Sequence, residues 1–446
     1  MKKYLQYLFF IVLIALVGVG TWSFMVYFEG EKPAIILDQD VKMIGQETTL
    51  GITCIDRKSG LRNVYVDISQ DGKKYTLSSL NLPQKGIEKE TLTVNVFPEE
   101  MKLHDGAATI DISVTDYSLR KNTTVSTFKV VIDTIPPRIS TAGFSNYINP
   151  GGSCVVTYSI SDDVSRSGVQ VGNNYFPSYL ETATEGIRHI SYFAIPMNTA
   201  KKNLKISILA EDNAGNSSIC PVSFHIRNKK FRGDRMNISQ RFLEMKMPEF
   251  QRRYKDLRET TLLEAFSRIN TEMRAQNLET IETICEKTHP EQLWEGTFLR
   301  MKNAATMATF GDRRTYYHDG REISKSVHMG VDLASTRNAP IEASNGGIVV
   351  FAGYLGIYGN TVIIDHGMGI FSLYGHLSSV SVNKEQAVTK GEMIGRTGNT
   401  GMAGGDHLHF SMIVGGKFVN PVEWWDPHWI KDNITRKLAS PQAKQS

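Results

Sequence analysis

The sequence predicts a mainly β, multidomain chain that begins with a transmembrane helix. Three observations lead to this prediction. A long apolar run occupies the N-terminus, alternating strand patterns recur between residues 33 and 230, and glycine-punctuated strands return from about residue 304 after a stretch of helical periodicity. The predicted order is therefore a helix, two β-sandwiches, a helical connector and a C-terminal antiparallel β domain.

The N-terminal segment is predicted to anchor the chain in a membrane. Two lysines precede an apolar run from Tyr4 to Phe28, which is longer than the roughly 20 residues that span a bilayer core. Lysines before the run favour an orientation with the N-terminus inside. The alternative is a signal peptide cleaved after Gly20, but the run continues well past that glycine. Residues 1–32 are expected to form a cytoplasmic stub and a single-pass anchor, and residues 30–446 to be exported.

Composition limits the functional classes. A hydrophobic content of 41% is ordinary for folded domains. The net charge of +4 is small and no basic residues cluster, so a nucleic-acid partner is not expected. The four cysteines form no C-x-x-C pair, which argues against a zinc–thiolate site.

Residues 33–230 contain a repeat of about 100 residues. The segments 112–133 and 206–226 each read as a strand, a turn rich in Asp and Asn, and an alternating strand. Pro136 and Pro137 separate the two units because proline cannot continue a hydrogen-bonded ladder. Short strands at this spacing predict two sandwiches that resemble the Ig-like modules of exported bacterial proteins, over residues 33–135 and 136–230.

The second unit contains two cysteines that an exported location allows to pair. Cys154 falls in an early strand and Cys220 in the last one. A disulfide between them and two free thiols are both compatible with the sequence, since connectivity cannot be read from spacing.

Residues 231–303 are predicted to form a helical connector. Ser239 can cap a helix start, and Leu262, Phe266, Ile269 and Met273 fall on one helical face. Such a face must pack on a neighbouring domain, and its position suggests that it limits access to the domain that follows. That β domain is predicted over residues 304–428, and residues 429–446 are expected to be a polar tail without a core pattern.

Five residues of the C-terminal β domain form the chemistry-bearing group. They are His328 and Asp332 in "HMGVDLA", His376 in "LYGHLS", and His407 and His409 in "GDHLHF". Two histidines and one carboxylate with an open fourth position suit a catalytic zinc ion. If "HLHF" is a strand, its two histidines point to the same face and into one site.

The segment from 310 to 426 resembles the M23-type (lysostaphin/LytM-like) zinc peptidases. The H-x-x-x-D, the G-H-L-S and the H-x-H motifs occur in order, with glycine-rich segments between them. Because three separated motifs coincide, the resemblance is specific, although it covers about a quarter of the chain. It implies an endopeptidase that hydrolyses cross-links or stem peptides of peptidoglycan through a metal-activated water.

The resemblance also implies a role for each residue. His328, Asp332 and His409 match the family's zinc ligands, so one Zn²⁺ per chain is expected. His376 and His407 match its two catalytic histidines that do not bind the metal. One would act as general base or proton shuttle and the other would stabilise the oxyanion, and the sequence does not say which does which.

Two residues depart from the family pattern around the H-x-H motif. Asp406 stands where a proline or small residue is frequent, and it should face away from the metal. Ser411 stands where an acidic residue is frequent. Neither change removes a catalytic group.

The remaining histidines are expected to be structural or exposed. His366, in "IIDHG", is the strongest further candidate for a metal ligand, but the same Asp-His-Gly occurs in the family without a ligand role. The others are His104, His189, His225, His289, His318 and His428.

The alternative function is a non-catalytic LytM-type regulator that binds peptidoglycan or activates another wall hydrolase. A scaffold that recruits an envelope protein through its Ig-like units is a third hypothesis. A membrane anchor with a long exported part favours a periplasmic protein of the inner membrane, and hence the direct cross-link of a Gram-negative wall.

Overall fold

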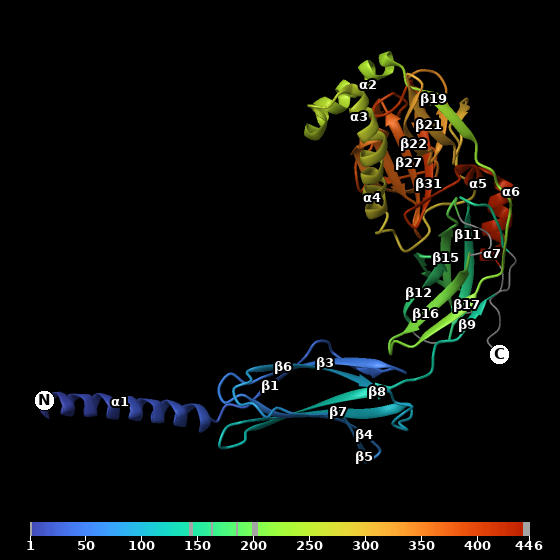
Figure 1. Cartoon of the computed structure of the whole chain (residues 1–446). Helices are drawn as coiled ribbons and strands as arrows, with labels where there is room; N and C mark the ends of the chain where they lie inside the picture. The colour runs from blue at the N-terminus through green and yellow to red at the C-terminus, as the bar shows by residue number, and fades with distance from the viewer. Residues whose placement is uncertain (1, 142–145, 162–163, 184–185, 199–203, 440–446) are drawn as a thin grey trace. The chain divides into compact units, whose positions relative to one another are not determined.

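The computed structural model describes residues 2–141, 146–161, 164–183, 186–198 and 204–439. Its internal contacts define two compact units. Unit 1 comprises Met1–Pro137 with the short segments Asp162–Ser165 and Glu211–Ser218, and unit 2 comprises the rest. The protein is mainly β with an N-terminal apolar helix, as the sequence predicts, and Figure 1 labels its elements.

The N-terminal helix α1 covers Lys2–Tyr27. Within it, Gln6–Met25 is long and apolar enough to cross a membrane, and none of this stretch is buried against the protein. A signal sequence meets the same description, so the helix is compatible with either an anchor or a signal.

The first β region lies in unit 1 and consists of two sheets around one apolar cluster. One sheet has the strand order β1-β3-β6 and the other the order β2-β8-β7-β4-β5. Alternating burial along β7 places its apolar side chains on the inner face. The strands are β1 Ala34–Leu37, β2 Met43–Ile44, β3 Thr48–Ile55, β4 Leu61–Gln70, β5 Lys73–Asn81, β6 Lys89–Val96, β7 Gly106–Asp116 and β8 Thr123–Ile132.

The second β region also has two main sheets, with the orders β14-β15-β11-β9 and β13-β12-β16-β17, and β10 pairs with β18. Its core is continuous with that of the C-terminal domain in unit 2. The strands are β9 Ile139–Thr141, β10 Asn146–Ile148, β11 Ser153–Ile160, β12 Val164–Val171, β13 Asn174–Pro177, β14 Tyr179–Ala183, β15 Gly186–Ala194, β16 Ile206–Asp212, β17 Ser217–Pro221 and β18 Phe224–Ile226.

All four cysteines are free thiols. Cys154 lies on β11 and Cys220 on β17, which belong to different sheets. Of the two sequence alternatives, the structure therefore shows the free thiols.

The connector is helical, as predicted, but it begins with a strand. Strand β19 (Gly233–Asn237) pairs in parallel with β21 and so extends a sheet of the C-terminal domain. Ser239 caps α2 (Gln240–Arg253), as its sequence position suggests. The 3₁₀ turn η2 (Lys255–Leu257) precedes a second helix, whose segments are α3 Leu262–Arg268, the π-turn η3 Ile269–Met273 and α4 Arg274–Ile284.

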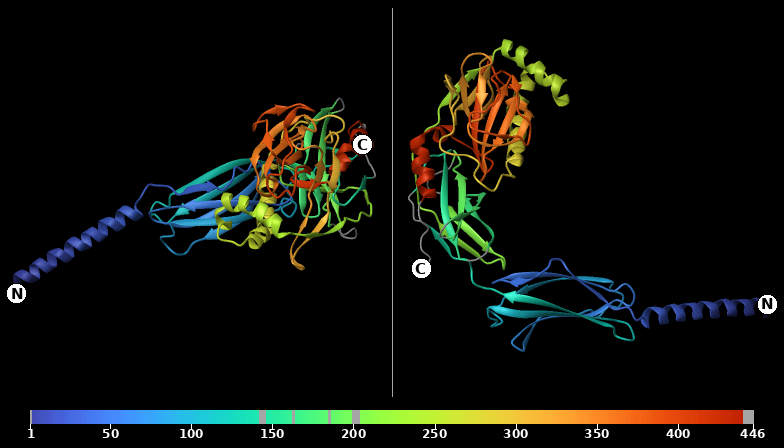
Figure 2. Two further views of the ribbon diagram at one scale, coloured as in Figure 1. Left: turned by 90° about the horizontal axis from the view of Figure 1, so that it is seen from above. Right: turned by 180° about the vertical axis from the view of Figure 1, so that it is seen from behind.

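The apolar face of this second helix is buried, with Phe266 and Ile269 at most 1% exposed. The connector contacts the C-terminal domain through η3 on β22 and through α4 on η4. Figures 1 and 2 show α4 running beside the strands of that domain. The expectation that this apolar helical face packs on a neighbouring domain is confirmed.

The C-terminal domain is built on one large antiparallel sheet with the order β20-β23-β31-β27-β26-β25-β29, and β32 pairs with β31. A smaller sheet, β24-β30-β28, packs beside it. The elements are β20 Ala305–Ala308, β21 Arg313–His318, β22 Arg321–Val327, β23 Val331–Ala334, β24 Pro340–Glu342, β25 Gly347–Tyr354, η4 Gly356–Tyr358, β26 Asn360–Asp365, β27 Ile370–Leu377, β28 Ser379–Val380, β29 Ala387–Val388, β30 Met393–Arg396, β31 Leu408–Val414 and β32 Lys417–Val419.

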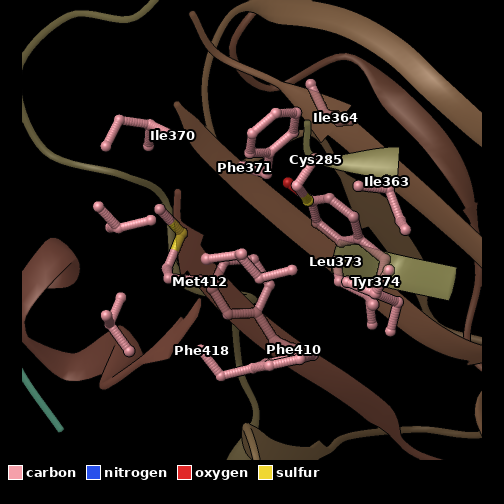
Figure 3. Close-up of a cluster of buried hydrophobic side chains, with 14 of the residues drawn as sticks. Cys285, Ile363, Ile364, Ile370, Phe371, Leu373, Tyr374, Phe410, Met412 and Phe418 are labelled. Carbon is pink, nitrogen blue, oxygen red and sulfur yellow. The ribbon is translucent and has the colours of Figure 1, made fainter. Parts of the chain in front are cut away.

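The central strands of this sheet form the centre of the core. Strands β27 and β31 are buried along their whole length, on both faces. Figure 3 shows Phe371 of β27 beside Cys285, which follows α4, and Phe410 and Met412 of β31 belong to the same buried cluster. A strand buried on both faces is held rigidly, and this rigidity fixes any polar side chain that the strand carries.

The tail expectation is wrong for the residues that the structure describes. Short helices follow the sheet, namely α5 Pro421–Trp425, α6 Pro427–Ile430, the π-turn η5 Lys431–Thr435 and α7 Arg436–Leu438. Ile430 and Ile434 are buried. Lys437 reaches the second β region, where its Nζ lies 3.1 Å from Cys154 Sγ. Residues 440–446 lie outside the described part of the chain.

Candidate metal centre

The central strands bring the predicted residues together. Asp332 on β23 and His409 on β31 are directly opposed partners in the ladder. His328 comes three residues before β23, and its Nε2 lies 2.9 Å from Asp332 Oδ1. His376 lies near the end of β27, which pairs with β31 on its other side. His407 stands just before β31, bridged to Gly398. The expectation that "HLHF" runs into a strand is confirmed from Leu408 onward.

Three side chains converge on one point. His328 Nε2 lies 3.0 Å from His409 Nδ1, and His409 Nδ1 lies 2.9 Å from Asp332 Oδ1. These atoms belong to a group that could hold a metal ion. All three residues are at most 9% exposed, so the group is shielded from water.

Neighbouring groups hold these donors in place. His328 Nδ1 donates to the Thr309 carbonyl at 2.9 Å, which leaves Nε2 as a lone pair. His409 Nε2 lies 3.0 Å from Ser411 Oγ, so its Nδ1 is the nitrogen that faces the group. Arg314 approaches the other oxygen of Asp332, Oδ2, at 3.4 Å. Such partners orient metal ligands in many sites.

The donor set fits a zinc ion. In a neutral His328 ring with its proton on Nδ1, the Nε2 lone pair faces Asp332 Oδ1 at 2.9 Å, and only a proton on Nε2 or a shared cation makes this approach favourable. Two imidazole nitrogens and one carboxylate oxygen are ligands that zinc takes in three-ligand catalytic sites. A cation bound by all three would remove the repulsion.

The other two histidines lie beside this group and share one arrangement. His376 Nδ1 donates to the Thr400 carbonyl, and His407 Nδ1 donates to the Gly405 carbonyl, both at 2.9 Å. Their ring centres are 4.8 Å apart. In a neutral ring with its proton on Nδ1, Nε2 is a proton acceptor, and the Nε2 of His407 lies 3.6 Å from Asp332 Oδ1.

His376 is held in a strained backbone conformation. Its φ is +66°, in the left-handed region that residues other than glycine seldom adopt. The surrounding sheet and the Thr400 contact hold the residue there, and strain of this kind gathers at functional sites.

The charges of the five residues depend on one another. Burial acts to raise the pKa of Asp332, but the charge and hydrogen bond of His328, with hydrogen bonds from His407 and His409, hold it well below its usual value. Burial lowers the pKa of His409 to about 4. Burial also lowers the pKa of His376 strongly, helped by the neighbouring His407 and His409. For His407, hydrogen bonding to Asp332 outweighs burial and raises the pKa.

Several contributing groups were missed at the sequence level. Ser411 was noted only as a departure, yet it is the partner of His409. The Thr309 and Thr400 contacts use backbone carbonyls, which no side-chain pattern reveals. Tyr358, whose ring lies 5.3 Å from that of His409, comes from a turn outside the motifs.

Asp406 lies away from the metal group, as expected. Its Oδ1 accepts from the Thr397 hydroxyl at 2.6 Å and its Oδ2 from the Asn338 amide. It therefore ties two loops together.

His366 is structural, as preferred at the sequence level. It is fully buried, with Nδ1 2.6 Å from the Gly346 carbonyl and Nε2 2.7 Å from Ser372 Oγ. Burial lowers its pKa to about 4. Because the ordinary value is 6.5, the unfolded chain binds a proton between these pH values that the folded chain does not.

The pH dependence of stability should reveal this buried ring. The contribution of His366 to the free energy of unfolding is fully present above pH 6.5. It decreases as pH falls toward 4, by up to about 3 kcal/mol. We expect the His366→Gln variant to be less stable at pH 7, but its unfolding midpoint should fall less steeply between pH 7 and 4. Thermal unfolding of both proteins with a chelator present measures this. Equal slopes would contradict the assignment of a neutral buried ring.

A sequence profile for "Peptidase family M23" matches residues 326–421. The chain contains an M23 peptidase domain. The matched segment holds all five residues described above and the strands that carry them. The predicted resemblance is confirmed.

Relatives of the M23 domain include named wall enzymes and a named activator. "DD-carboxypeptidase/endopeptidase Mpg" of Neisseria meningitidis serogroup B is 44% identical over 96 residues, which are 22% of each chain. "Peptidoglycan DD-endopeptidase ShyA" of Vibrio cholerae is 41% identical over 103 residues, 23% of this chain and 24% of the relative. "Murein hydrolase activator NlpD" of Salmonella dublin is 36% identical over 112 residues, 24% of this chain and 29% of the relative.

Each of these similarities covers less than a quarter of this chain. The matched part spans less than a third of each of the three relatives. The β regions, the connector and α1 lie outside the profile match.

Proposed function

We propose that the M23 domain is a zinc-dependent endopeptidase that hydrolyses peptide cross-links or stem peptides of peptidoglycan. One observation carries the proposal: the site is complete, with three donors converging and two further histidines beside them. A domain that had lost its chemistry would be free to lose these residues. The names of two relatives, both DD-endopeptidases, favour the direct cross-link to D-alanine.

In this proposal His328, Asp332 and His409 hold one Zn²⁺ through Nε2, a carboxylate oxygen and Nδ1. A bound zinc ion supplies a Lewis acid that polarises a carbonyl and lowers the pKa of a coordinated water to about 7. The protein's own contribution is to fix the three ligands on adjacent strands and to exclude bulk water from them.

His376 and His407 carry the proton transfers. Each presents Nε2 from a ring whose Nδ1 is tied to a backbone carbonyl, so each ring has one orientation and one tautomer. A neutral ring accepts a proton from the attacking water, and a protonated ring donates to the developing oxyanion or to the leaving amine. The two rings lie close enough to act on one scissile bond.

The rival function is a regulator that activates another hydrolase, and the named activator among the relatives favours it. Digestion of purified peptidoglycan separates the two. The endopeptidase releases soluble peptides when incubated alone, and it loses this activity in His409→Ala. A regulator releases nothing alone, and it stimulates an added wall hydrolase equally with or without His409.

The rest of the chain is proposed to place this domain in the envelope. Helix α1 would be a single-pass inner-membrane anchor, with residues 30–446 in the periplasm. Residues 33–135 and 136–230 would be Ig-like spacers or a site for an envelope protein. A mature protein that begins at Thr21, detected by N-terminal sequencing, would contradict the anchor.

The connector supports a loop that orients a catalytic histidine. Lys246 of α2 is 3% exposed and donates to the Asn399 carbonyl. The next residue, Thr400, receives the His376 Nδ1 hydrogen bond. Phe242 of the same helix approaches Gly404, farther along this loop. Helix α2 therefore contacts the loop between β30 and β31, which contains the carbonyl that orients His376.

Replacing Lys246 with methionine should lower turnover several-fold and leave zinc content unchanged, because the Asn399 carbonyl loses its donor and the loop shifts under His376. Lys417→Met is the matched control, since Lys417 also joins the connector to the domain, through Glu282 of α4, but it lies on β32 and not on this loop. Assays on purified peptidoglycan measure both variants. A rise in activity in Lys246→Met would instead show that α2 covers the groove.

A further inference from the structure

A second cluster of carboxylates lies in unit 1, apart from the M23 domain. Glu29, Asp56 and Asp116 have oxygen atoms that all lie within 4.8 Å of one another. The three residues are at most 5% exposed. They come from distant parts of the sequence: Glu29 follows α1, Asp56 follows β3 and Asp116 ends β7.

Neutral donors hold each carboxylate in place. Asp56 Oδ1 accepts from the amides of Lys58 and Gly60, at 3.1 and 2.7 Å. Asp116 Oδ1 accepts from the amide and hydroxyl of Ser118, at 3.0 and 2.7 Å. These hydrogen bonds orient the two carboxylates and bring no positive charge to them.

Glu29 contributes a buried oxygen that has no hydrogen bond. Glu29 Oε1 accepts from the Ser59 amide at 3.0 Å, but the buried Oε2 has no hydrogen-bond partner. The hydroxyl of Ser59, the residue whose amide binds Glu29 Oε1, is also buried and without a hydrogen-bond partner. Buried polar oxygens are nearly always satisfied, so these two, on residues joined by a hydrogen bond, indicate a missing ligand.

The cation paired with Glu29 of the cluster, Lys58, is shared with an exposed carboxylate. Lys58 Nζ lies 3.8 Å from Glu29 Oε2, beyond hydrogen-bonding distance. The same ammonium group lies 2.8 Å from Glu31, and the Lys58 side chain is 49% exposed. It is therefore engaged by an exposed carboxylate, while three buried ones remain close together.

The second β region provides an internal comparison. Asn216 Nδ2 donates to Asp212 Oδ2 and to the Asp133 carbonyl, as Asn122 Nδ2 donates to Asp116 Oδ2 and to the Glu29 carbonyl. The Asp–Asn turn is thus a shared structural feature of both repeats. In the first region the Glu29 and Asp56 carboxylates lie beside this turn, within reach of Asp116.

We propose that Glu29, Asp56 and Asp116 bind a calcium ion. All identified donors are oxygens, which excludes a preference for zinc or copper and favours a hard cation. Oxygen atoms spread over this distance suit Ca²⁺, whose ligands lie at about 2.3–2.6 Å, better than Mg²⁺, which demands about 2.0–2.1 Å. The bound ion joins the residue that follows α1 to the ends of β3 and β7, and so fixes the exit of the N-terminal helix to the first β region.

Calorimetric titration of the full chain with CaCl₂ tests the proposal. The protein is purified in detergent, loaded with zinc and freed of calcium by a selective chelator. We expect one binding event for Ca²⁺ and weaker binding of Mg²⁺. Glu29→Gln should weaken Ca²⁺ binding at least about tenfold, because it removes one charged ligand. Asp67→Asn is the matched control, a buried carboxylate of the same region that is already paired with Lys74.

Limited proteolysis supplies a second readout. Calcium should slow cleavage of the segment between α1 and β1 in the wild type and in Asp67→Asn, but not in Glu29→Gln. If Glu29→Gln fails to fold, the calcium titrations of Asp116→Asn and of the wild type still test whether the cluster binds Ca²⁺. Absence of Ca²⁺ binding at millimolar concentration, or equal binding by Glu29→Gln, overturns the proposal. Neither result bears on the zinc site, because zinc content is measured separately.

Discussion

Replacing His409 with alanine is expected to abolish zinc binding and peptidoglycan cleavage together. His409 Nδ1 is the donor that faces both His328 and Asp332, so its loss leaves two ligands. Three protein ligands are the norm for a catalytic zinc site. The effect should exceed the roughly 10- to 100-fold that removal of an outer partner costs. Zinc content by elemental analysis and release of soluble peptides measure it.

Two variants serve as controls for His409→Ala. Ser411→Ala removes only the partner of His409 Nε2, so we expect zinc affinity to fall about 10- to 100-fold while cleavage is recovered at high zinc concentration. His366→Gln changes a buried histidine of the same sheet that does not face the metal group, and it should retain zinc. If His409→Ala kept its zinc or its activity, the ligand assignment would be wrong.

Replacing His376 should separate chemistry from metal binding. We expect His376→Asn to retain zinc and to lose about 10²- to 10⁴-fold in turnover, the usual contribution of a general acid or base. Asparagine is chosen because the φ of +66° at this position penalises alanine more than asparagine. Zinc content, kcat and KM are measured on the same preparation.

His407→Asn is the companion variant. Both histidines flank the site, so both variants should lose turnover. In the pH profile of the residual activity, one variant should lose the acidic limb and the other the basic limb. Full activity in His376→Asn would refute the proposed mechanism even if zinc and the reaction class were correct. Loss of zinc in that variant would make His376 a ligand instead.

The candidate site could be predicted because its residues occur in three separated motifs. His328, Asp332, His376, His407 and His409 were all placed from the sequence, and the fold brings them together. The period of two along a strand was enough to predict that His407 and His409 share a site. The groups that orient them could not be predicted, because backbone carbonyls carry no sequence signal and only the fold decides which one meets a ring nitrogen.

The fold was predicted less completely than the site. The strand β19 was missed because "GDRMN" has no apolar alternation, and parallel pairing with β21 decides its conformation. The tail was predicted to lack a core because its apolar residues that pack on the core, Ile430 and Ile434 among them, are few and separated by polar residues. Lys437 is buried in that tail, and a lysine normally predicts exposure. In each case tertiary contacts override the local pattern.

Cleavage of a purified, directly cross-linked muropeptide dimer tests the central claim most directly. The full chain is assayed as purified, after chelation, and after chelation followed by added zinc, with products identified by mass spectrometry. We predict conversion of dimer to monomers, loss of conversion after chelation, and its return with zinc. Persistence of the dimer with zinc-loaded protein, together with stimulation of an added hydrolase, would contradict the endopeptidase and establish the regulator.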